Sequence, residues 1–463
     1  MTRRGRGRTT ALPRVDAART AAFDVLRAVD ERDSYANLVL PGLLREREIT
    51  GRDAALATEL VYGTLRGLGT YDAVLAACLD RAPEALDPPV LDVLRLGAHQ
   101  VLGTRIPPHA AVDTTVGLAR ARVGEGPGKL VNAVMRRLSR HDMAGWIDQL
   151  APPASTDPLE RLALQHSHPP WIVRALLDAL GGDESELAAA LAADNERPFV
   201  TLVARPGRAE VSELVAAGAS PAHWSPYAAV LGEGDPAAIP AVRERRAGVQ
   251  DEGSQLVALA LATAPLNGPD RRWLDMCAGP GGKAALLAGL ATLRDARLLA
   301  VERQPHRARM VEAALRGDPG RHRVVVADAT EPLDGEDPFD RILLDAPCTG
   351  LGALRRRPEA RWRRRPSDLP TLRSLQISLL RAALSAVRPG GLVAYVTCSP
   401  HLAETTTVVT DVLRGRPDVE RVDARACLPG VPDLGDGPEI QLWPHRHGTD
   451  AMFLALLRRE PID

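Results

Sequence analysis

Two cysteines each follow an apolar segment of strand length, and their side chains could do covalent chemistry. Cys348 stands three residues after Asp345, which ends the apolar segment 339–345, and Cys398 directly follows the apolar segment 391–397. The carboxyl ends of parallel strands meet at one edge of a sheet, so we expect both thiols to face one pocket. Two thiols are expected where a pyrimidine ring is attacked covalently, because a thiolate added at C6 makes C5 nucleophilic.

A glycine-rich turn marks a place for ligand binding. The apolar segment 272–276 leads into it and the segment 284–290 has helix-forming composition, which predicts a strand, a tight turn and a helix. Glycines let a ligand approach the backbone, and the N–H groups that start the helix favour an anionic group. The pattern is neither G-x-G-x-x-G nor a P-loop, which disfavours a dinucleotide or a nucleoside triphosphate and leaves another nucleoside-containing cofactor open. The turn residues predicted to contact the cofactor are Cys277, Ala278, Gly279, Pro280, Gly281, Gly282 and Lys283.

Carboxylates end the strands that follow. Glu302 lies about twenty residues beyond the glycine turn, where α/β nucleotide folds place a carboxylate on ribose hydroxyls. Asp328 is expected beside the edge of the adenine, and Asp345 begins an Asp-Ala-Pro-Cys turn. One acidic residue at a strand end is often only a helix cap, whereas a series of them favours a shared ligand site. These three carboxylates are therefore predicted to bind the cofactor.

The elements that must position these residues alternate between strand and helix from residue 273 onward. The expected strands after the glycine turn are 297–302, 323–328, 339–345 and 391–397. A long helix is expected at 369–387. The alternation predicts a Rossmann-like α/β domain with a doubly wound, mostly parallel sheet. By contrast, residues 18–140 have apolar positions at helical spacing, which predicts an all-α domain.

The length of the chain predicts a multidomain protein. At 463 residues it is too long for one ordinary core. The expected parts are a basic disordered arm at 1–12, an all-α RNA-binding domain at 13–150, a linker with a small α/β RNA-binding subdomain at 151–248, and a catalytic domain at 249–463.

Local arginine clusters, rather than overall charge, indicate a nucleic acid partner. The formal net charge is −1, so no basic field surrounds the whole chain. The densest cluster, residues 354–366, follows Cys348 and holds seven arginines around one tryptophan. Arginine suits bidentate contact with phosphate, and an aromatic ring stacks on bases. The residues predicted to bind an RNA backbone are Arg355, Arg356, Arg357, Arg361, Trp362, Arg363, Arg364 and Arg365.

Cysteine usage and hydropathy disfavour several classes of protein. The five cysteines have no regular spacing, which disfavours a disulfide framework or a zinc site. The pairs His166/His168 and His445/His447 lack partners at ligand spacing, so no metal is expected. The N-terminus lacks the apolar core of a secretory signal, and no uncharged apolar run approaches the ~18 residues of a membrane span. A cytoplasmic protein without membrane contact is predicted.

Several of these motifs together resemble one family. The stretches that carry the likeness in the α/β region are 249–255, 275–283, 345–350, and Thr397-Cys398-Ser399 with Glu404 six residues beyond Cys398. They are similar to the Sun (Fmu) family of RNA cytosine-5 methyltransferases. In the helical region, the stretches 58–66, 106–113 and 130–138 resemble the NusB-like RNA-binding domain. This combination is similar to the bacterial RsmB-type methyltransferases of small-subunit ribosomal RNA, and the likeness spans most of the chain.

The resemblance implies a function and a role for each motif. It implies methyl transfer from S-adenosylmethionine to C5 of a specific cytosine in 16S ribosomal RNA, through a covalent adduct between a cysteine and C6. Cys398 would be the nucleophile and Cys348 would help product release. The cofactor would contact residues 277–283 and the three strand-end carboxylates. The partner is then small-subunit ribosomal RNA, and we expect the protein to act as a monomer.

The sequence departs from the family pattern at four positions near the turn. Gly279 and Met276 stand where Ala and Leu are usual, and Glu302 stands where Asp is common. Ala284 stands where Thr or Ser usually follows the lysine. None of the four removes a catalytic group, so we expect them to change cofactor affinity rather than activity.

The motifs leave other functions open. In a DNA cytosine-5 methyltransferase the Pro-Cys thiol attacks, which would leave Cys398 and the NusB-like region without a role. A cytosine-5 methyltransferase of transfer RNA or of large-subunit ribosomal RNA also fits, as does a non-catalytic RNA-binding assembly factor. A nicotinamide dehydrogenase is disfavoured by the glycine pattern.

Overall fold

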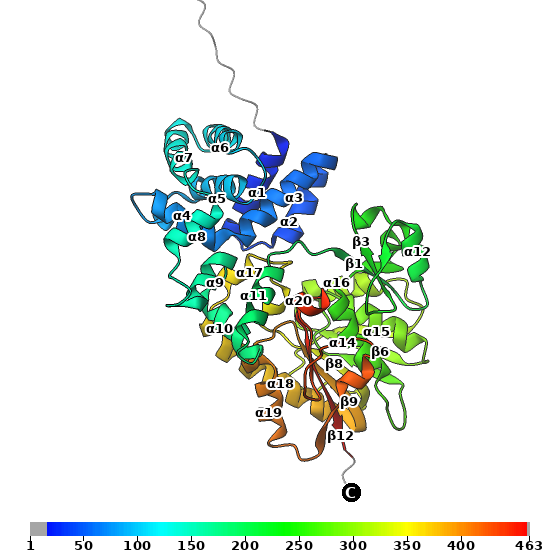
Figure 1. Ribbon diagram of the computed structural model, residues 1–463. Helices are drawn as coiled ribbons and strands as arrows, with labels where there is room; N and C mark the ends of the chain where they lie inside the picture. The colour runs from blue at the N-terminus through cyan, green and yellow to red at the C-terminus, as the bar shows by residue number, and fades with distance from the viewer. Residues whose placement is uncertain (1–15, 461–463) are drawn as a thin grey trace, which may run out of the picture. The chain divides into compact units, whose positions relative to one another are not determined.

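The computed structural model describes residues 16–460, which form two compact units (Figure 1). Residues up to Arg174 and the distant segment Arg356–Arg363 make up the first, the helical unit. The second, the sheet unit, contains Ala175–Arg355 and the chain from Arg364 onward. Residues 151–174 therefore pack with the helical unit, although the sequence grouped them with the small subdomain. The basic arm expected at 1–12 lies outside the described residues.

The helical unit consists of α-helices around an apolar core. Its main helices are α1 (Ala17–Arg32), α2 (Ala36–Glu46), α3 (Gly51–Arg66), α4 (Leu68–Cys78), α5 (Pro88–Leu102), α6 (Pro108–Arg122), α7 (Glu125–Leu138), α8 (Met143–Leu150) and α9 (Pro158–His166), and the short α17 (Ala360–Arg363) belongs to it as well. Asp16 caps α1 by accepting the N–H of Arg19. Leu60 and Leu94 lie at helical spacing among other apolar residues and have no exposed surface. The predicted all-α domain is confirmed.

A small antiparallel sheet opens the sheet unit after α10 (Pro170–Ala179) and α11 (Glu184–Ala193). Its strands have the order β2-β3-β1-β4. They are β1 (Val200–Ala204), β2 (Ser220–Pro221), β3 (Ala228–Leu231) and β4 (Ala247–Val249), with α12 (Val211–Ala216) and α13 (Pro240–Arg243) between them in the chain. Leu202, Leu214 and Ile239 form an apolar cluster of this part alone.

The main sheet has the strand order β10-β12-β9-β8-β5-β6-β7, and β11 pairs with β12. Its strands are β5 (Arg272–Asp275), β6 (Arg297–Glu302), β7 (Arg321–Val326), β8 (Phe339–Asp345), β9 (Val387–Thr397), β10 (Val419–Val422), β11 (Ile440–Gln441) and β12 (Phe453–Arg459). The five strands from β5 to β9 pair in parallel, whereas β12 runs antiparallel to β9 and β10. The predicted α/β fold is confirmed, with an antiparallel edge added to the parallel sheet.

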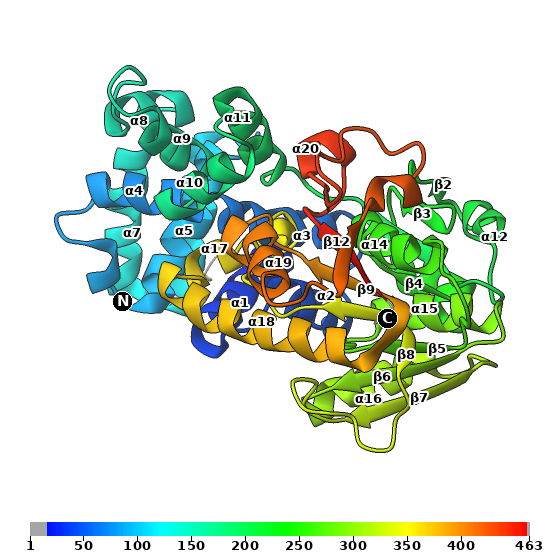
Figure 2. The same ribbon diagram turned by 90° about the horizontal axis from the view of Figure 1, so that it is seen from below.

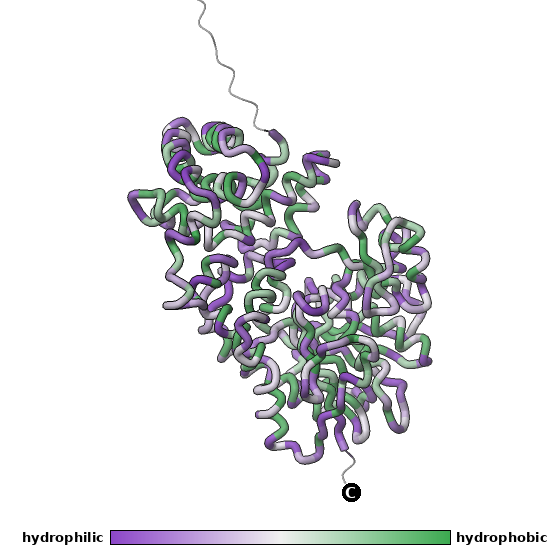
Figure 3. Tube along the Cα trace, in the orientation of Figure 1, coloured by the Kyte–Doolittle hydropathy of each residue, from purple (hydrophilic) through white to green (hydrophobic). Residues whose placement is uncertain are grey.

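Helices cover both faces of this sheet (Figure 2). One face carries α14 (Glu252–Thr263), α15 (Gly282–Thr292) and α16 (Pro305–Leu315), and the other carries α18 (Leu369–Ala386) and α19 (Thr406–Leu413). Side chains along the strands alternate between the two: Leu343 packs with the α14 side, and its neighbours Ile342 and Leu344 pack with the α18 side. Because both faces are buried, the central strands are continuously apolar, and Figure 3 shows hydrophobic residues gathered along them.

None of the helices in residues 16–460 combines the length and the apolar character needed to cross a membrane. In the same residues no group of three or more His, Cys, Asp or Glu side chains is arranged to hold a metal ion. The pair His445/His447 has other partners: His445 contacts Glu186, and His447 contacts the backbone carbonyl of Pro432.

Candidate active site

The predicted cofactor turn joins β5 to α15 at the carboxyl edge of the parallel strands. The N–H of Ala278 donates to the carbonyl of Val301 on β6, so the turn stays attached to the sheet after β5 has ended. Gly281 has a φ of +111°, and a Cβ placed on it would lie 2.7 Å from the Cβ of Ala314 on α16. Both the backbone conformation and the closeness of α16 therefore require glycine there.

Glu302, at the end of β6, is almost completely buried and holds this turn. Its carboxylate accepts the N–H of Gly279 at 3.1 Å and the N–H of Gln304 at 2.9 Å. The guanidinium of Arg307 lies beside it, with Nε 3.6 Å from Oε2, and donates to the carbonyl of Gly279. A carboxylate has about four acceptor positions, so Glu302 can hold the turn and still accept from a ligand hydroxyl.

Two departures from the family pattern, Gly279 and Glu302, are linked because these two residues are in close contact. A Cβ placed on Gly279 would lie only 2.2 Å from Oε2 of Glu302. The same Cβ would lie 2.9 Å from Nε of Arg307. The longer acid at 302 therefore favours glycine at 279, and a shorter Asp at 302 would remove the closer of these two contacts. The sequence motifs showed the two departures but gave no reason to connect them.

Lys283, the last residue of the predicted motif, points at Asp345 rather than to solvent. Its Nζ lies 2.9 Å from Oδ2 of Asp345 at the end of β8 and 3.3 Å from Oγ of Ser254 on α14. Burial acts to lower the pKa of Lys283, but the charge and hydrogen bond of Asp345 outweigh it and the pKa is raised. Lys283 is thus a fixed cation in this part of the site.

Asp275, at the end of β5, adds a second carboxylate that the site prediction did not include. It has no exposed surface. Burial raises its pKa to about 8, and the charge of Asp345 acts in the same direction. Its position at a strand end next to the glycine turn was the signal that could have identified it.

The two predicted cysteines are in direct contact, with 3.3 Å between their sulfur atoms. Both are free thiols rather than a disulfide. The hydrogen bond between them and burial raise the pKa of Cys348 well above its usual range. The same hydrogen bond, aided by the charge of Lys283, lowers the pKa of Cys398. The pair therefore favours a thiol at Cys348 that donates to a thiolate at Cys398.

Backbone contacts lock the segments that carry the two thiols. The N–H of Gly352 donates to the carbonyl of Cys398 at 2.8 Å, and the carbonyl of Gly352 accepts the N–H of Ala451 at 2.8 Å. A Cβ on Gly352 would lie 1.9 Å from the carbonyl oxygen of Ala451, so only glycine fits. Nearby, the buried guanidinium of Arg355 binds Asp251 at 3.3 Å and Asp450 at 3.2 Å.

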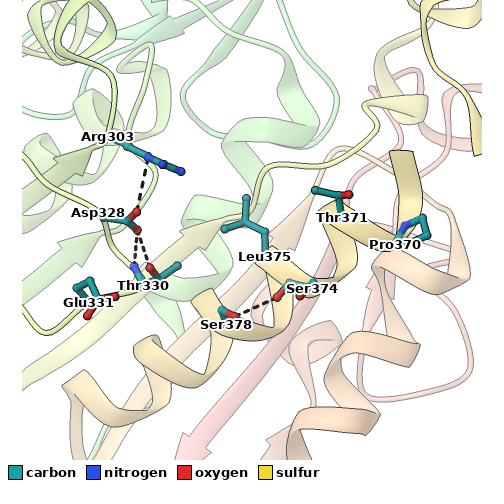
Figure 4. Close-up of a pocket in the computed structure, with 9 residues that line it drawn as sticks. All are labelled: Arg303, Asp328, Thr330, Glu331, Pro370, Thr371, Ser374, Leu375 and Ser378. Atoms are coloured by element: carbon teal, nitrogen blue, oxygen red, sulfur yellow. Dashed lines mark hydrogen bonds and ion pairs between the residues drawn. The ribbon is translucent and has the colours of Figure 1, made fainter. Parts of the chain in front are cut away.

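Asp328 lines an open pocket of about 770 Å³ at the same edge of the sheet (Figure 4). Its carboxylate accepts from the N–H of Thr330 at 3.0 Å and from the Thr330 hydroxyl at 2.7 Å, and these bonds lower its pKa. Nε of Arg303 lies 3.6 Å from Oδ2 of Asp328. Across the pocket, α18 contributes Pro370, Thr371, Ser374, Leu375 and Ser378. These α18 residues carry no motif, so the sequence gave no sign of them.

The arginine cluster is divided between the two units, and part of it is not available at a surface. Arg355 is buried in the sheet unit by its two ion pairs. Arg361, in the helical unit, has no exposed surface and donates to the carbonyls of Arg66 and Ser167. We therefore remove these two guanidinium groups from the predicted RNA surface.

Most other members of the cluster are also engaged with protein. In the helical unit, Arg363 donates to the carbonyls of Val29 and Ser34. The guanidinium carbons of Arg357 and Arg363 lie 5.0 and 5.2 Å from the centre of the Tyr35 ring, where cations interact favourably with the ring. In the sheet unit, Nε of Arg364 donates to the carbonyl of Thr349. RNA contact stays a prediction for Arg356, Arg357, Trp362, Arg363, Arg364 and Arg365.

The chain matches two family models and is similar to proteins along its whole length. The model of 16S rRNA methyltransferases RsmB/F matches residues 260–458, and that of the NusB family matches residues 16–140. A protein of Mycobacterium tuberculosis (strain ATCC 25618 / H37Rv), named as a candidate methyltransferase, is 53% identical over 99% of this chain and 100% of its own length. The ribosomal RNA small subunit methyltransferase B of Pseudomonas putida is 34% identical over 88% of this chain and 91% of its own length. The chain belongs to the RsmB/F family.

Solved structures agree with this fold. The crystal structure of PH0851 superposes with a TM-score of 0.79 at 23% identity, covering 96% of this chain and 98% of that one. A methyltransferase homologue from Pyrococcus horikoshii gives a TM-score of 0.51 at 23% identity, with 63% of this chain and 99% of that chain covered. The resemblance to a NusB-like domain joined to a methyltransferase domain is thus confirmed. In this RsmB/F member, the glycine turn, the Lys283–Asp345 pair and the two thiols belong to the methyltransferase domain.

Proposed function

We propose that the protein transfers a methyl group from S-adenosylmethionine to C5 of a cytosine in 16S ribosomal RNA, with Cys398 attached to C6 during the reaction. The observation that carries the proposal is the contact of 3.3 Å between the two thiols, beside the cation Lys283. Membership of the RsmB/F family supports ribosomal RNA as the substrate.

The residues at the carboxyl edge of the sheet fit the proposed cofactor. Glu302 has acceptor positions left for ribose hydroxyls. Asp328 offers an acceptor across the pocket from the apolar Leu375, which suits a flat heterocycle with an exocyclic amine. The turn 277–283 provides the start of α15 for an anionic group. When bound, S-adenosylmethionine supplies an electrophilic methyl group.

The chain's own groups explain how the ring becomes reactive. The thiolate of Cys398 adds to C6, and the electron pair of the C5–C6 double bond moves toward C5, which then accepts the methyl group. A water molecule then takes the proton at C5, the electron pair of that C–H bond re-forms the C5–C6 double bond, and the bond between C6 and sulfur breaks to return the thiolate of Cys398. Cys348 keeps its proton and lies in contact with the sulfur that must leave, which suits a role in release.

Substitution of each cysteine tests this assignment. We expect Cys398→Ala to abolish methylation and to form no covalent adduct. Cys348→Ala should still attack, stall at release and accumulate protein linked to RNA. Denaturing gels with labelled 16S RNA measure the linkage. A denaturation-resistant adduct with Cys398→Ala but not with Cys348→Ala would reverse the two roles.

The identity of the RNA needs a separate measurement. Bisulfite or mass-spectrometric mapping of RNA from a deletion strain should show one 5-methylcytosine missing from 16S ribosomal RNA. Loss of the modification only from transfer RNA or from large-subunit ribosomal RNA would overturn the proposed substrate while leaving the chemistry intact.

A further inference from the structure

A buried carboxylate that the proposed reaction does not use lies behind the two thiols. Glu404 ends the short turn Leu402–Glu404 that follows β9, and it has no exposed surface. It forms no ion pair within the described residues 16–460, so its charge is balanced by hydrogen bonds alone. Burying a carboxylate without a cation is costly, and an apolar side chain would fill the space at lower cost.

The hydrogen bonds of Glu404 reach both cysteine segments. Oε1 accepts the N–H of Thr349 at 2.8 Å and Nε2 of Gln376 at 3.1 Å. Oε2 accepts the hydroxyl of Thr349 and, at 2.7 Å, the hydroxyl of Ser399. Thr349 directly follows Cys348, and Ser399 directly follows Cys398. One carboxylate thus fixes the residue after each thiol.

Further bonds tie the same group to its surroundings. Gln376, from α18, also donates to the carbonyl of Pro347, the residue before Cys348, at 2.9 Å. The hydroxyl of Tyr395 on β9 donates to the backbone carbonyl of Glu404 at 2.6 Å. The hydroxyls of Thr349 and Ser399 are themselves 3.1 Å apart. The separation of the two thiols therefore depends on a network with Glu404 at its centre.

The nearby charged groups act differently on the two thiols. The charge of Glu404 raises the pKa of Cys348 and is not among the main influences on Cys398. Lys283 acts on Cys398, whose pKa it lowers, while Asp345 acts on both thiols. The other titratable groups near the network are Asp450, Tyr395 and His401. A negative group that acts on Cys348 and a positive group that acts on Cys398 favour a proton on Cys348 and a thiolate at Cys398.

We propose that Glu404 is a positioning residue that holds the two thiols in contact and keeps the proton of the pair on Cys348. The inference rests on the proposed function, because it gives the attacking role to Cys398. No atom is lost or gained in this step: Cys348 retains its proton, and Cys398 uses its own electron pair to bond to C6. Glu404 does not touch the substrate in this scheme. It acts through its hydrogen bonds to Thr349, Ser399 and Gln376 and through the effect of its charge on Cys348.

Alkylation of the two thiols across a pH series tests the proposal on the full chain without RNA or cofactor. Iodoacetamide reacts with thiolates, and peptide mass spectrometry reads Cys348 and Cys398 separately, which a titration of the coupled pair would not do. In the unaltered protein, Cys398 should reach half-maximal alkylation at a lower pH than Cys348. Glu404→Gln should narrow the gap between the two midpoints by about one pH unit or more. The matched control is Glu420→Gln, an exposed position on β10 where both midpoints should stay unchanged.

Steady-state kinetics of Glu404→Gln provide a second test of the proposal. Loss of hydrogen bonds to a charged group should lower kcat about 10- to 100-fold, while the KM for S-adenosylmethionine stays within about twofold. A fall in kcat with no change in either alkylation midpoint would reduce Glu404 to a structural role and overturn the proposal. Unchanged midpoints together with unchanged kcat would do the same. The alkylation result stands even if the substrate assignment fails, so the two hypotheses are separable.

Two milder variants keep the test decisive if Glu404→Gln does not fold. Thr349→Val and Ser399→Ala each remove one hydroxyl that donates to Glu404 and leave the carboxylate in place. We expect each to narrow the gap between the midpoints and to lower kcat by about fivefold, the effect of one modest hydrogen bond. Midpoints and kcat equal to those of the unaltered protein in both variants would contradict the proposal.

Discussion

Glu302, the last residue of β6, and Glu404, which follows β9, are both buried carboxylates. Each accepts a backbone N–H from a segment of the candidate site. They differ in what balances the charge. Arg307 lies beside Glu302, whereas the donors to Glu404 are the neutral groups of Thr349, Ser399 and Gln376. The carboxylate of Glu302, with Arg307 beside it, holds the turn and can accept from a neutral hydroxyl, and its charge acts on the neighbouring Asp275 and Cys277. The charge of Glu404, which has no cation beside it, acts on the thiol of Cys348. Under the proposed function, the same residue type thus supports cofactor binding at Glu302 and reactivity of the thiols at Glu404.

The largest effect on activity should follow from removal of Lys283, the cation that acts on Cys398. Lys283→Met deletes the charge that lowers the pKa of Cys398 and leaves Asp345 without its partner. Because the thiolate is the active form, the pH at which activity is half-maximal should rise, and kcat at neutral pH should fall by about 10²-fold or more, as for other groups that stabilise charge in an active site. Rate measurements from pH 6 to 9 check this. Lys129→Met is the matched control, since Lys129 is the other lysine of the chain and is exposed.

An unchanged pH profile in Lys283→Met would mean that the thiols do not sense this cation. The contrast between the two ends of the site would then have to rest on Glu404 alone.

A smaller effect is expected from changes at Glu302 and Gly279, in the predicted cofactor site. Glu302→Ala removes a charged acceptor and should weaken S-adenosylmethionine binding about 10- to 100-fold, which titration calorimetry measures.

Gly279→Ala forces a methyl group against the carboxylate of Glu302 and should lower the free energy of unfolding by about 1–3 kcal/mol, the cost of an overpacked contact. The double variant Gly279→Ala, Glu302→Asp should recover part of that stability, because the shorter acid removes the closest contact of the methyl group and leaves the contact with Nε of Arg307. Calorimetry on the unaltered protein, the single variants Gly279→Ala and Glu302→Asp, and the double variant measures the coupling. Additive effects in the double variant would show that the two positions are independent.

The smallest effect concerns the arginines. Replacing Arg364 and Arg365 by Gln should flatten the log-log salt dependence of RNA affinity by roughly 0.7 to 0.9 for each phosphate that the protein no longer neutralises. Arg361→Gln should leave that slope unchanged and lower the melting temperature instead, since Arg361 is buried and bonded to backbone carbonyls. Filter binding over a salt series, together with thermal unfolding, separates the two. A flattened slope in Arg361→Gln would place that side chain on the RNA after all.

Local sequence signals were enough to predict the elements and the motifs on them. The strand 339–345 and the start of the long helix at residue 369 match β8 and α18, because burial on both faces makes apolar runs, and these mark the elements directly. The glycine turn and the contact of Cys348 with Cys398 follow from the same rule, since parallel strands bring their carboxyl ends together. The antiparallel β12 was not foreseen, because pairing partners far apart in the sequence leave no local pattern.

Contacts between distant side chains account for what the sequence did not predict. The roles of Thr349 and Gln376 depend on Glu404, which lies 55 and 28 residues away along the chain. A run of arginines is typical of a solvated surface, and only the tertiary structure shows that Arg361 is buried instead. Single-residue motifs such as Asp275 are visible in the sequence, but their burial is not.

Because the segment Arg356–Arg363 belongs to the helical unit, one cut in the chain cannot separate the two units. The residues of this segment lie in the chain between Cys348 and α18, yet they belong to the helical unit, where Glu359 accepts the N–H of Ala36 and Arg363 binds the carbonyl of Val29. A fragment that begins at residue 175 would keep these eight residues and lack every one of those partners. Evolutionary gain or loss of the N-terminal helices would therefore require a matching change within the methyltransferase sequence. The two family models match separate stretches of the chain, yet the stretch matched by the RsmB/F model contains a segment that belongs to the helical unit.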